Sequence, residues 1–352
     1  MEQIFLKLKN LIEITWEFLE RENFIRPFLV IVIIIVISSI SMSLVEPGLS
    51  LYDSLWWTIV TLTTVGYGDI TPQTIPGRII AFIDMLVGIG VLAIITAQVA
   101  SIFVERKINQ DLGMDSYDFE NHIILCEWNY RAEIIIKELR LEPEIQKTPI
   151  ILIADIERKP TTDKDLFFVK GQVSDKTLHQ ANLKKAKTVI ILGDSNLDYT
   201  NRDAKVVLST LTIESLNPDV YTIVELVDEA HIKTCKRARA DEIIVSSKLS
   251  SHLISSAAIN HGISKVISDI VSYGYGSQLF KIPVPKSEVG SLFMDVFMKM
   301  KLDSHSTVIA IEQGKTGETI SNPAPGYQLA ADDYLIYIAR FEQSHSSNLN
   351  MD

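Results

Sequence analysis

Six consecutive residues, Thr64-Val65-Gly66-Tyr67-Gly68-Asp69, carry the clearest chemistry in this chain. Two glycines one residue apart allow backbone angles that residues with a Cβ resist. Where left- and right-handed residues alternate, successive carbonyl oxygens turn to one side, and the Thr64 hydroxyl adds an oxygen below them. A ring of such oxygens, built from several copies of the loop, replaces the water around a dehydrated cation. The alternative is an ordinary Gly-Tyr-Gly turn between two apolar segments.

Two long apolar segments flank this loop. Residues 27–45 contain no charged residue, and residues 77–104 contain only Arg78 and Asp84. Both segments are long enough to cross a bilayer as helices. Residues 50–62 are too short to span, which predicts a re-entrant helix whose C-terminal dipole end favours a cation. Asp84 is an ionisable group inside a predicted span, so it is a functional candidate as well as a structural one.

Charges outside the spans predict the orientation of the chain. Lys and Arg residues precede residue 27 and follow residue 104, whereas the loop between the spans has none before Arg78. Both termini are therefore predicted to be cytoplasmic. Residues 1–26 place apolar side chains at helical spacing, which predicts an amphipathic helix on the membrane surface, with a coil or a helix packed on the soluble domain as the alternative. The polar residues 342–352 are expected to be disordered.

Composition excludes several other functions. The formal net charge of −11 argues against nucleic-acid binding, which requires a basic face. Cys126 and Cys235 are predicted to be free, buried thiols because neither has the spacing of a metal ligand. The sequence offers no Ser/His/Asp or Tyr/Lys constellation, so we predict that the chain is not an enzyme.

The rest of the chain has the pattern of a soluble α/β protein. Polar residues 105–118 predict a linker, and from residue 119 short apolar strands alternate with helices, which predicts a parallel, doubly wound sheet. The predicted strands are 122–126, 149–154, 167–169, 188–192, 220–225 and 242–245. The predicted helices are 130–141, 175–182, 198–215, 229–239 and 249–260. A small α+β unit follows, with predicted strands 278–284, 307–313 and 334–339 and a helix at 289–300.

The turn after the first predicted strand departs from the usual dinucleotide-binding pattern. It reads Cys126-Glu127-Trp128-Asn129 instead of a glycine-rich turn that lets a phosphate approach the backbone. Glu127 would repel a phosphate. Asp155, however, closes the second strand at the place where a ribose-binding acid is expected. The pattern argues against nucleotide binding at this turn.

These motifs carry a resemblance to a known family. Residues 63–69 with their two spans resemble the pore of tetrameric K⁺ channels, and residues 119–341 resemble the RCK (regulator of K⁺ conductance) domain. The second resemblance rests on residues 122–129, 194–203, 217–226, 240–246, 322–325 and 331–336. The whole chain thus resembles a two-transmembrane prokaryotic K⁺ channel with a cytoplasmic RCK domain, similar to calcium-gated members.

The resemblance implies a fold and an assembly. We expect an α-helical membrane pore at residues 27–104, followed by an α/β Rossmann-like N-lobe at 119–260 and a small α+β C-lobe at 261–341. K⁺ is the implied permeant ion, and Thr64 to Asp69 are the implied selectivity filter. A homotetramer in the prokaryotic inner (plasma) membrane is implied, in which additional RCK subunits would complete an octameric ring.

The resemblance also implies a gating route. In this family, ligand binding to the RCK ring pulls on the inner helices. Gly88 matches the family's hinge position, with Gly90 as a second option and close helix packing as the alternative role. The implied pore-lining residues are Ile89, Ala93, Thr96, Ala97 and Ser101.

Two classes of regulatory ligand are open, a divalent cation such as Ca²⁺ and a nucleotide. Calcium-gated relatives carry two acids with i, i+2 spacing at the end of the fifth strand, but here Glu225 is followed by Val227 in the second position. Glu225 and Asp228 are the candidate metal ligands. The other candidate ligand-binding residues are Asp155, Asp194 and Asp198, with solvated or capping acids as the alternative. A membrane-anchored NAD-dependent enzyme and a regulatory subunit of a K⁺ transporter are the competing functions.

Overall fold

The computed structural model describes residues 25–272 and 276–340. The chain divides into two compact units, Met1–Asn109 and Gln110–Asp352, and each is described by itself. Apart from residues 25 and 26, the predicted N-terminal amphipathic segment lies outside the described residues, as does the predicted tail at 342–352.

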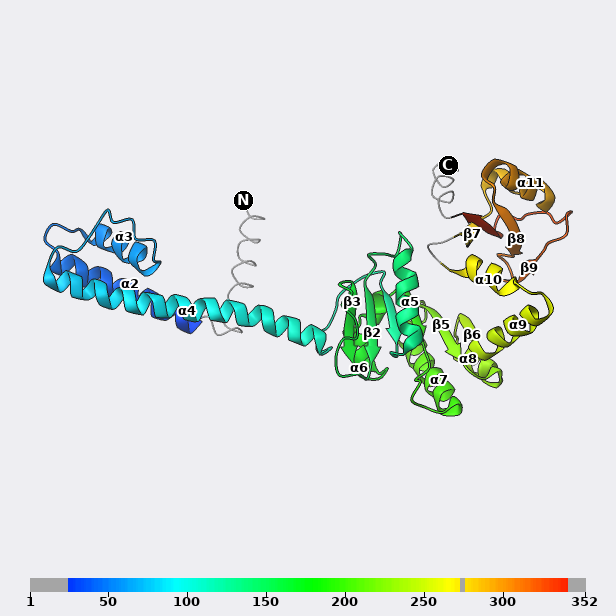
Figure 1. Cartoon of the computed structure of the whole chain (residues 1–352), viewed down its shortest axis with the longest axis horizontal. Helices are drawn as coiled ribbons and strands as arrows, with labels where there is room; N and C mark the ends of the chain where they lie inside the picture. The colour runs from blue at the N-terminus through cyan, green and yellow to red at the C-terminus, as the bar shows by residue number, and fades with distance from the viewer. Residues whose placement is uncertain (1–24, 273–275, 341–352) are drawn as a thin grey trace. The chain divides into compact units, whose positions relative to one another are not determined.

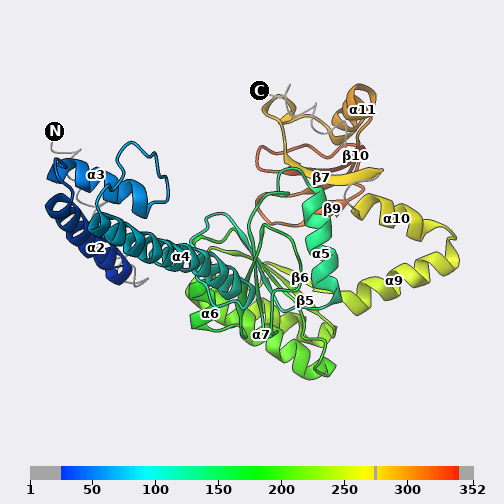
Figure 2. The ribbon, with the colours of Figure 1, turned by 60° about the vertical axis from the view of Figure 1, so that its left-hand side comes forward.

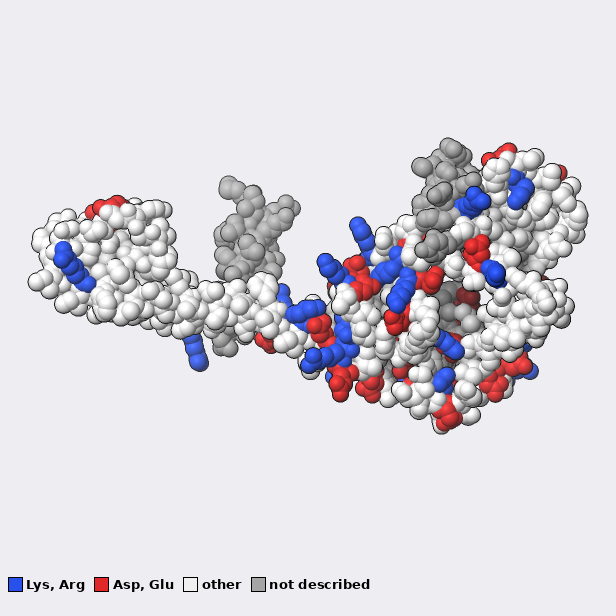
Figure 3. Space-filling view, in the orientation of Figure 1, with Lys and Arg blue, Asp and Glu red and all other residues white. Residues whose placement is uncertain are grey.

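In the first unit, the structure describes the helices α2 (Ile25–Val45), α3 (Leu51–Leu62) and α4 (Ile75–Asp111) from residue 25 onward (Figure 1). Two of them, Arg26–Val45 with mean hydropathy 2.9 and Ile75–Asp111 with 2.6, are long and apolar enough to cross a membrane, as the sequence predicts. Charged side chains are sparse over this unit and dense over the second (Figure 3). Helix α4 continues to Asp111, so part of the predicted linker is helical.

The short helix α3 packs against both apolar helices, α2 and α4. Its first turn is capped by Ser50, whose side chain accepts the Asp53 N–H. Trp57 is 5% exposed and forms a small core with Met42 of α2 and Ala81 of α4. The re-entrant helix predicted from residues 50–62 is therefore present, and it is held by the two spans on either side of it.

The second unit begins with a six-stranded parallel sheet in the order β3-β2-β1-β4-β5-β6. This is the doubly wound order in which ligands bind beyond the carboxyl ends of the strands. The strands are β1 (Ile123–Cys126), β2 (Ile150–Ala154), β3 (Leu166–Lys170), β4 (Thr188–Ile191), β5 (Tyr221–Leu226) and β6 (Glu242–Val245). Every residue of β1 and β2 is buried, as expected for strands covered on both faces.

Helices cover both faces of this sheet (Figure 2). Alternate strand residues pack either against α5 (Tyr130–Leu141) or against α6 (Asp175–Gln180) and α7 (Tyr199–Leu216). Ser174 is the N-cap of α6 and forms a capping box with Thr177. The predicted helix at 229–239 is divided into a 3₁₀ turn, Glu229–His231, and α8 (Ile232–Arg237), and α9 (Ser246–Ile259) follows β6 directly. A further 3₁₀ turn is Leu183–Lys185, and α10 (Ile263–Val271) completes this part.

The last part is a four-stranded antiparallel sheet in the order β7-β10-β8-β9. Its elements are β7 (Ser277–Pro283), a 3₁₀ turn (Lys286–Glu288), α11 (Phe293–Ser304), β8 (Thr307–Glu312), β9 (Thr319–Ser321) and β10 (Tyr334–Arg340). Phe293, Ile311 and Leu335 are at the centre of its core. The short strand β9 was missed in the sequence because three residues carry no periodic pattern.

Candidate functional site

The loop after α3 has the alternating backbone that its sequence predicts. Thr64, Gly66 and Gly68 have φ angles of +60°, +59° and +75°, whereas Val65 and Tyr67 between them do not have positive φ. Residues with positive φ therefore alternate with residues without it, which is the alternation expected to turn successive carbonyl oxygens to one side. Thr64 adopts this conformation against the steric preference of a β-branched residue.

Hydrogen bonds and ring contacts hold this loop at both ends. The Val65 and Gly66 N–H groups both donate to the Val60 carbonyl oxygen of α3, at 3.1 and 3.2 Å. At the other end, the Trp56 indole Nε1–H donates to Asp69 Oδ2 at 2.9 Å. The Trp56 ring also stacks on the Tyr67 ring with centroids 6.1 Å apart. Helix α3 thus fixes the loop through its last turn and through one exposed tryptophan.

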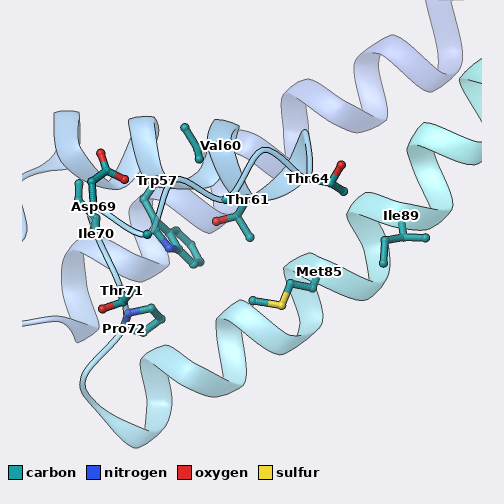
Figure 4. Close-up of a pocket in the computed structure, with 12 residues that line it drawn as sticks. Trp57, Val60, Thr61, Thr64, Asp69, Ile70, Thr71, Pro72, Met85 and Ile89 are labelled. Carbon is teal, nitrogen blue, oxygen red and sulfur yellow. The ribbon is translucent and has the colours of Figure 1, made fainter.

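A cavity of about 350 Å³ lies between this loop and α4 (Figure 4). Thr64, Gly66 and Gly68 line it from the loop, and Met85 and Ile89 line it from α4. The structure therefore brings Ile89, a predicted pore-lining residue, to the same cavity as the predicted filter. The other predicted pore-lining residues, Ala93, Thr96, Ala97 and Ser101, are exposed along α4.

Gly88 lies on a different face of α4, against the end of α3. A Cβ at Gly88 would lie 3.0 Å from Leu62 Cδ2 and 3.2 Å from both the Cα and the carbonyl oxygen of Leu62. A Cβ at Gly90 would have no atom within 4 Å. Helix α4 runs through both glycines without interruption. Close packing against α3 therefore supports the alternative role given to Gly88, and a hinge role stays a prediction.

In the second unit, Glu225 lies near the end of β5 and Asp228 follows this strand. Each carboxylate already has a partner within the domain. Glu225 forms an ion pair with Arg131 of α5, and its side chain is 11% exposed. The Asp228 side chain caps the next turn by accepting the Ala230 N–H at 2.9 Å. The two main-chain N–H groups of Val227 and Asp228 donate to the carboxylate of Asp203, at 2.9 Å each. The β5 end is thus held by an arginine and by a fully buried aspartate.

Asp203 and Arg131 were not identified in the sequence. Asp203 is an acid at helical spacing from the apolar Val206 and Ile213 on the buried face of α7, and that position was the available signal. Arg131 gave no comparable signal, because only the sheet topology places α5 beside the end of β5.

The turn after β1 is filled by an ion-paired cluster. Lys205 Nζ lies 2.6 Å from Glu127 Oε1 and 3.0 Å from Asp194 Oδ2. Burial raises the pKa of Glu127, and the neighbouring Lys205 opposes this only in part. Burial disfavours the charged form of Lys205, but its bonds to both carboxylates outweigh that effect and leave its pKa raised. Glu127 also has a φ of +76°, a conformation that glycine adopts more readily.

The remaining candidate acids have local roles or are exposed. Asp198 caps α7 by accepting the Thr200 and Asn201 N–H groups at 3.1 and 3.2 Å, and its bonds to Asn201 lower its pKa. Asp155 is exposed at the end of β2. Within residues 25–272 and 276–340, no three His, Cys, Asp or Glu side chains are placed to hold a metal ion. The metal-ligand role predicted for Glu225 and Asp228 thus finds no assembled site in the described part of the chain.

Comparison with known proteins now adds to this geometry. Residues 28–105 match the ion channel family, and residues 118–224 match the RCK domain family of slowpoke-like calcium-activated potassium channels. The chain is similar to potassium channels that join a two-helix pore to an RCK domain. The two matches confirm the predicted order, a membrane pore followed by an RCK domain.

Individual relatives match most of this chain. It is 29% identical to the calcium-gated potassium channel TvoK of Thermoplasma volcanium, over 82% of each chain. It is 26% identical to potassium channel protein 1 of Methanocaldococcus jannaschii, over 90% of this chain and 93% of the other. Among solved structures, the human SLO3 gating ring matches with a TM-score of 0.51 at 16% identity, over 64% of this chain and 45% of that one. The last match shows the fold of the RCK domain.

Proposed function

We propose that four copies of this chain form a potassium-selective pore that a ligand of the RCK domain opens or closes. The observation that carries this proposal is the alternation of left-handed φ angles at Thr64, Gly66 and Gly68 in a loop held between two spans. One such loop supplies one quarter of each oxygen ring, so a fourfold assembly completes the sites for a dehydrated K⁺ ion. Additional RCK subunits would extend the four domains to an octameric ring.

The membrane arrangement in this proposal follows from charge. The loop between the spans has Glu46, Asp53 and Asp69 but no Lys or Arg before Arg78. This asymmetry supports cytoplasmic termini and a place in the prokaryotic inner membrane. The RCK domain would then face the cytoplasm and bind a cytoplasmic ligand.

Of the two ligand classes, a divalent cation has the better support. A pyrophosphate at the turn after β1 would meet the carboxylate of Glu127, which Lys205 already holds in place. A cation at the β5 end would instead find Glu225, whose partner Arg131 is half exposed and free to be displaced into solvent. The relative from Thermoplasma volcanium is named as calcium-gated, so Ca²⁺ is the cation to test first.

The competing functions predict different behaviour in one experiment. Liposomes that contain the purified full chain and are loaded with K⁺ should take up external Rb⁺ as K⁺ leaves. Ba²⁺ should block this uptake. A membrane-anchored NAD-dependent enzyme or a regulatory subunit of a K⁺ transporter would give no uptake by itself. Repeating the assay with Ca²⁺ and then with NAD inside the liposomes identifies the ligand class, and absence of Rb⁺ uptake under all conditions would overturn the proposal.

A further inference from the structure

The buried face of α4 is a narrow line of small side chains. Within the first unit its buried residues are Gly77, Ala81, Asp84 and Gly88. Steps of four, three and four residues place them on one side of the helix. Asp84 is the exception in this line, because it is an acid with only 4% of its surface exposed.

The outer end of this line is attached to the end of α2. Glu46, which follows α2, accepts the Thr74 N–H at 2.9 Å and the Thr74 hydroxyl at 2.7 Å through Oε1. The same oxygen occupies the position where a Cβ of Gly77 would lie. The start of α4 therefore packs directly onto the Glu46 carboxylate.

The attachment is repeated at Asp84. The Ser38 hydroxyl of α2 donates to Asp84 Oδ1, and both side chains are at least nine-tenths buried. The next residue of α2, Ser39, donates to the Thr58 hydroxyl of α3 at 3.3 Å. In a bilayer interior no water competes for these groups, so a hydrogen bond between helices is retained. One turn of α2 thus holds both α3 and α4.

These attachments end at Gly88. Gly88 lies one helical turn beyond Asp84 and packs on Leu62, as described above. From residue 89 to residue 111, no residue of α4 is buried within this chain. The outer part of α4 is therefore fixed to α2 and α3 by buried side chains. Beyond Gly88 the contact with α2 is looser, because Val91 and Leu92 are half-buried and line a partly open hollow with residues of α2.

We propose that Asp84 is a positioning residue for gating. Its hydrogen bond to Ser38 fixes the outer part of α4 to α2, so that displacement of α4 by the RCK domain begins at Gly88 and does not reach the filter loop. This inference rests on the proposed channel function. It assigns to Asp84 a task that the filter and the RCK domain do not perform.

A double-mutant cycle tests the bond in the full chain in planar bilayers at one fixed Ca²⁺ concentration. Ser38→Ala and Asp84→Val should each shift the ratio of open to closed time in the same direction, by roughly threefold to fifteenfold, the range of interhelical hydrogen bonds in membranes. The double variant should shift the ratio no further than either single variant. The K⁺ to Na⁺ permeability ratio should stay at the parent value, which separates an effect on gating from damage to the filter.

Two controls complete the design. Asp84→Asn keeps a side-chain oxygen that accepts a hydrogen bond from the Ser38 hydroxyl, so this variant should gate like the parent. Ser43→Ala removes a serine of the same helix whose hydroxyl bonds to its own backbone, at Ile40 O, and it should leave gating unchanged. Additive effects in the cycle, parental gating in Ser38→Ala, or an equal shift in Ser43→Ala would each overturn the inference.

Failure of the proposed function has a different signature. A parent chain without Rb⁺ uptake would reject the channel but not the bond. The bond can then be tested by measuring the melting temperature of the same three variants in detergent, which needs no ion flux. If Ser38 and Asp84 are coupled, the double variant should lower the melting temperature by less than the sum of the two single variants. Independent effects of the two substitutions on the melting temperature would reject the bond itself.

Discussion

The loop at residues 64–69, which we propose as the selectivity filter, and the acidic strand ends of the RCK domain differ in which atoms are available to bind a ligand. In the loop, side chains such as Trp56 and Asp69 bond to one another, while the backbone conformation sets where the carbonyl oxygens lie. In the RCK domain, the carboxylates of Glu225 and Glu127 already hold Arg131 and Lys205. A main-chain site of this kind is set by its own residues, whereas a carboxylate site depends on what the fold places beside it.

The largest effect is expected at Gly66. Gly66→Ala keeps open space around the new Cβ but places it on a residue with φ +59°. A left-handed alanine costs about 1–2 kcal/mol in each of the four subunits of the proposed assembly, so the K⁺ to Na⁺ permeability ratio should fall by about tenfold or more, or conduction should stop. Bi-ionic reversal potentials measure the ratio. Gly90→Ala is the matched control and should keep the parental permeability ratio, because its Cβ would have no atom within 4 Å. A parental permeability ratio in Gly66→Ala would contradict the filter assignment.

The next effect concerns the ion-paired turn after β1. Lys205→Met leaves Glu127 and Asp194 without their shared cation, which should lower the stability of the full chain by about 2 kcal/mol at neutral pH. The pKa of Asp194 is lowered mainly by its bonds to Asn196 and Lys205, against the effect of burial, so its stabilising contribution is lost as pH falls through that lowered value. Glu127, with its raised pKa, is protonated earlier in the same descent.

The difference in melting temperature between Lys205→Met and the parent should therefore shrink as pH falls from 7 towards 4. Lys184→Met, at an exposed lysine of the same domain, is the control and should melt like the parent across this range. A difference that grows towards low pH would mean that the cluster does not depend on these carboxylates.

A smaller effect is expected at the end of β5, where two substitutions should shift the Ca²⁺ sensitivity in opposite directions. If Ca²⁺ binds Glu225, Glu225→Gln removes a ligand charge and should raise the Ca²⁺ concentration that half-maximally changes Rb⁺ flux. Arg131→Gln frees the same carboxylate and should lower that concentration, each by roughly twofold to fivefold, the size of a partly exposed ion pair. Shifts in the same direction would show that the pair is structural and that the ligand binds elsewhere.

The smallest effect is expected in the inner pore. Ala97 carries no charge on the face of α4 predicted to line the pore, so a modest single-channel conductance is expected. Ala97→Glu would place a ring of carboxylates around the proposed pore and concentrate K⁺ beside it, so the conductance should rise on the order of twofold. The rise should shrink at high salt, because added ions screen the ring. Ala97→Gln is the neutral control. Equal conductance of the two variants at low salt would place the limit at the filter instead.

Much of the fold followed from local pattern. The two spans, the re-entrant helix and the strands of the parallel sheet were predicted within a few residues, because apolar runs and their lengths are properties of short segments. The predicted break between β6 and α9 is absent, because Val245 passes directly into the helix at Ser246. Strand β9 and the division of the helix at 229–239 were also missed, since both are shorter than a reliable period.

The sequence by itself predicted the loop at residues 64–69, because its two glycines permit positive φ and its hydrogen bonds to Val60 and Trp56 reach only the neighbouring helix α3. Only the tertiary structure decided the state of the candidate acids. Arg131, Lys205 and Asp203 come from helices that the sheet order brings to the strand ends, and no spacing in the chain predicts which strand end each of them contacts. The same holds for Ser38 and Asp84, whose bond exists because two spans pack side by side. Backbone conformation is local, whereas the pairing of charges depends on how the whole domain folds.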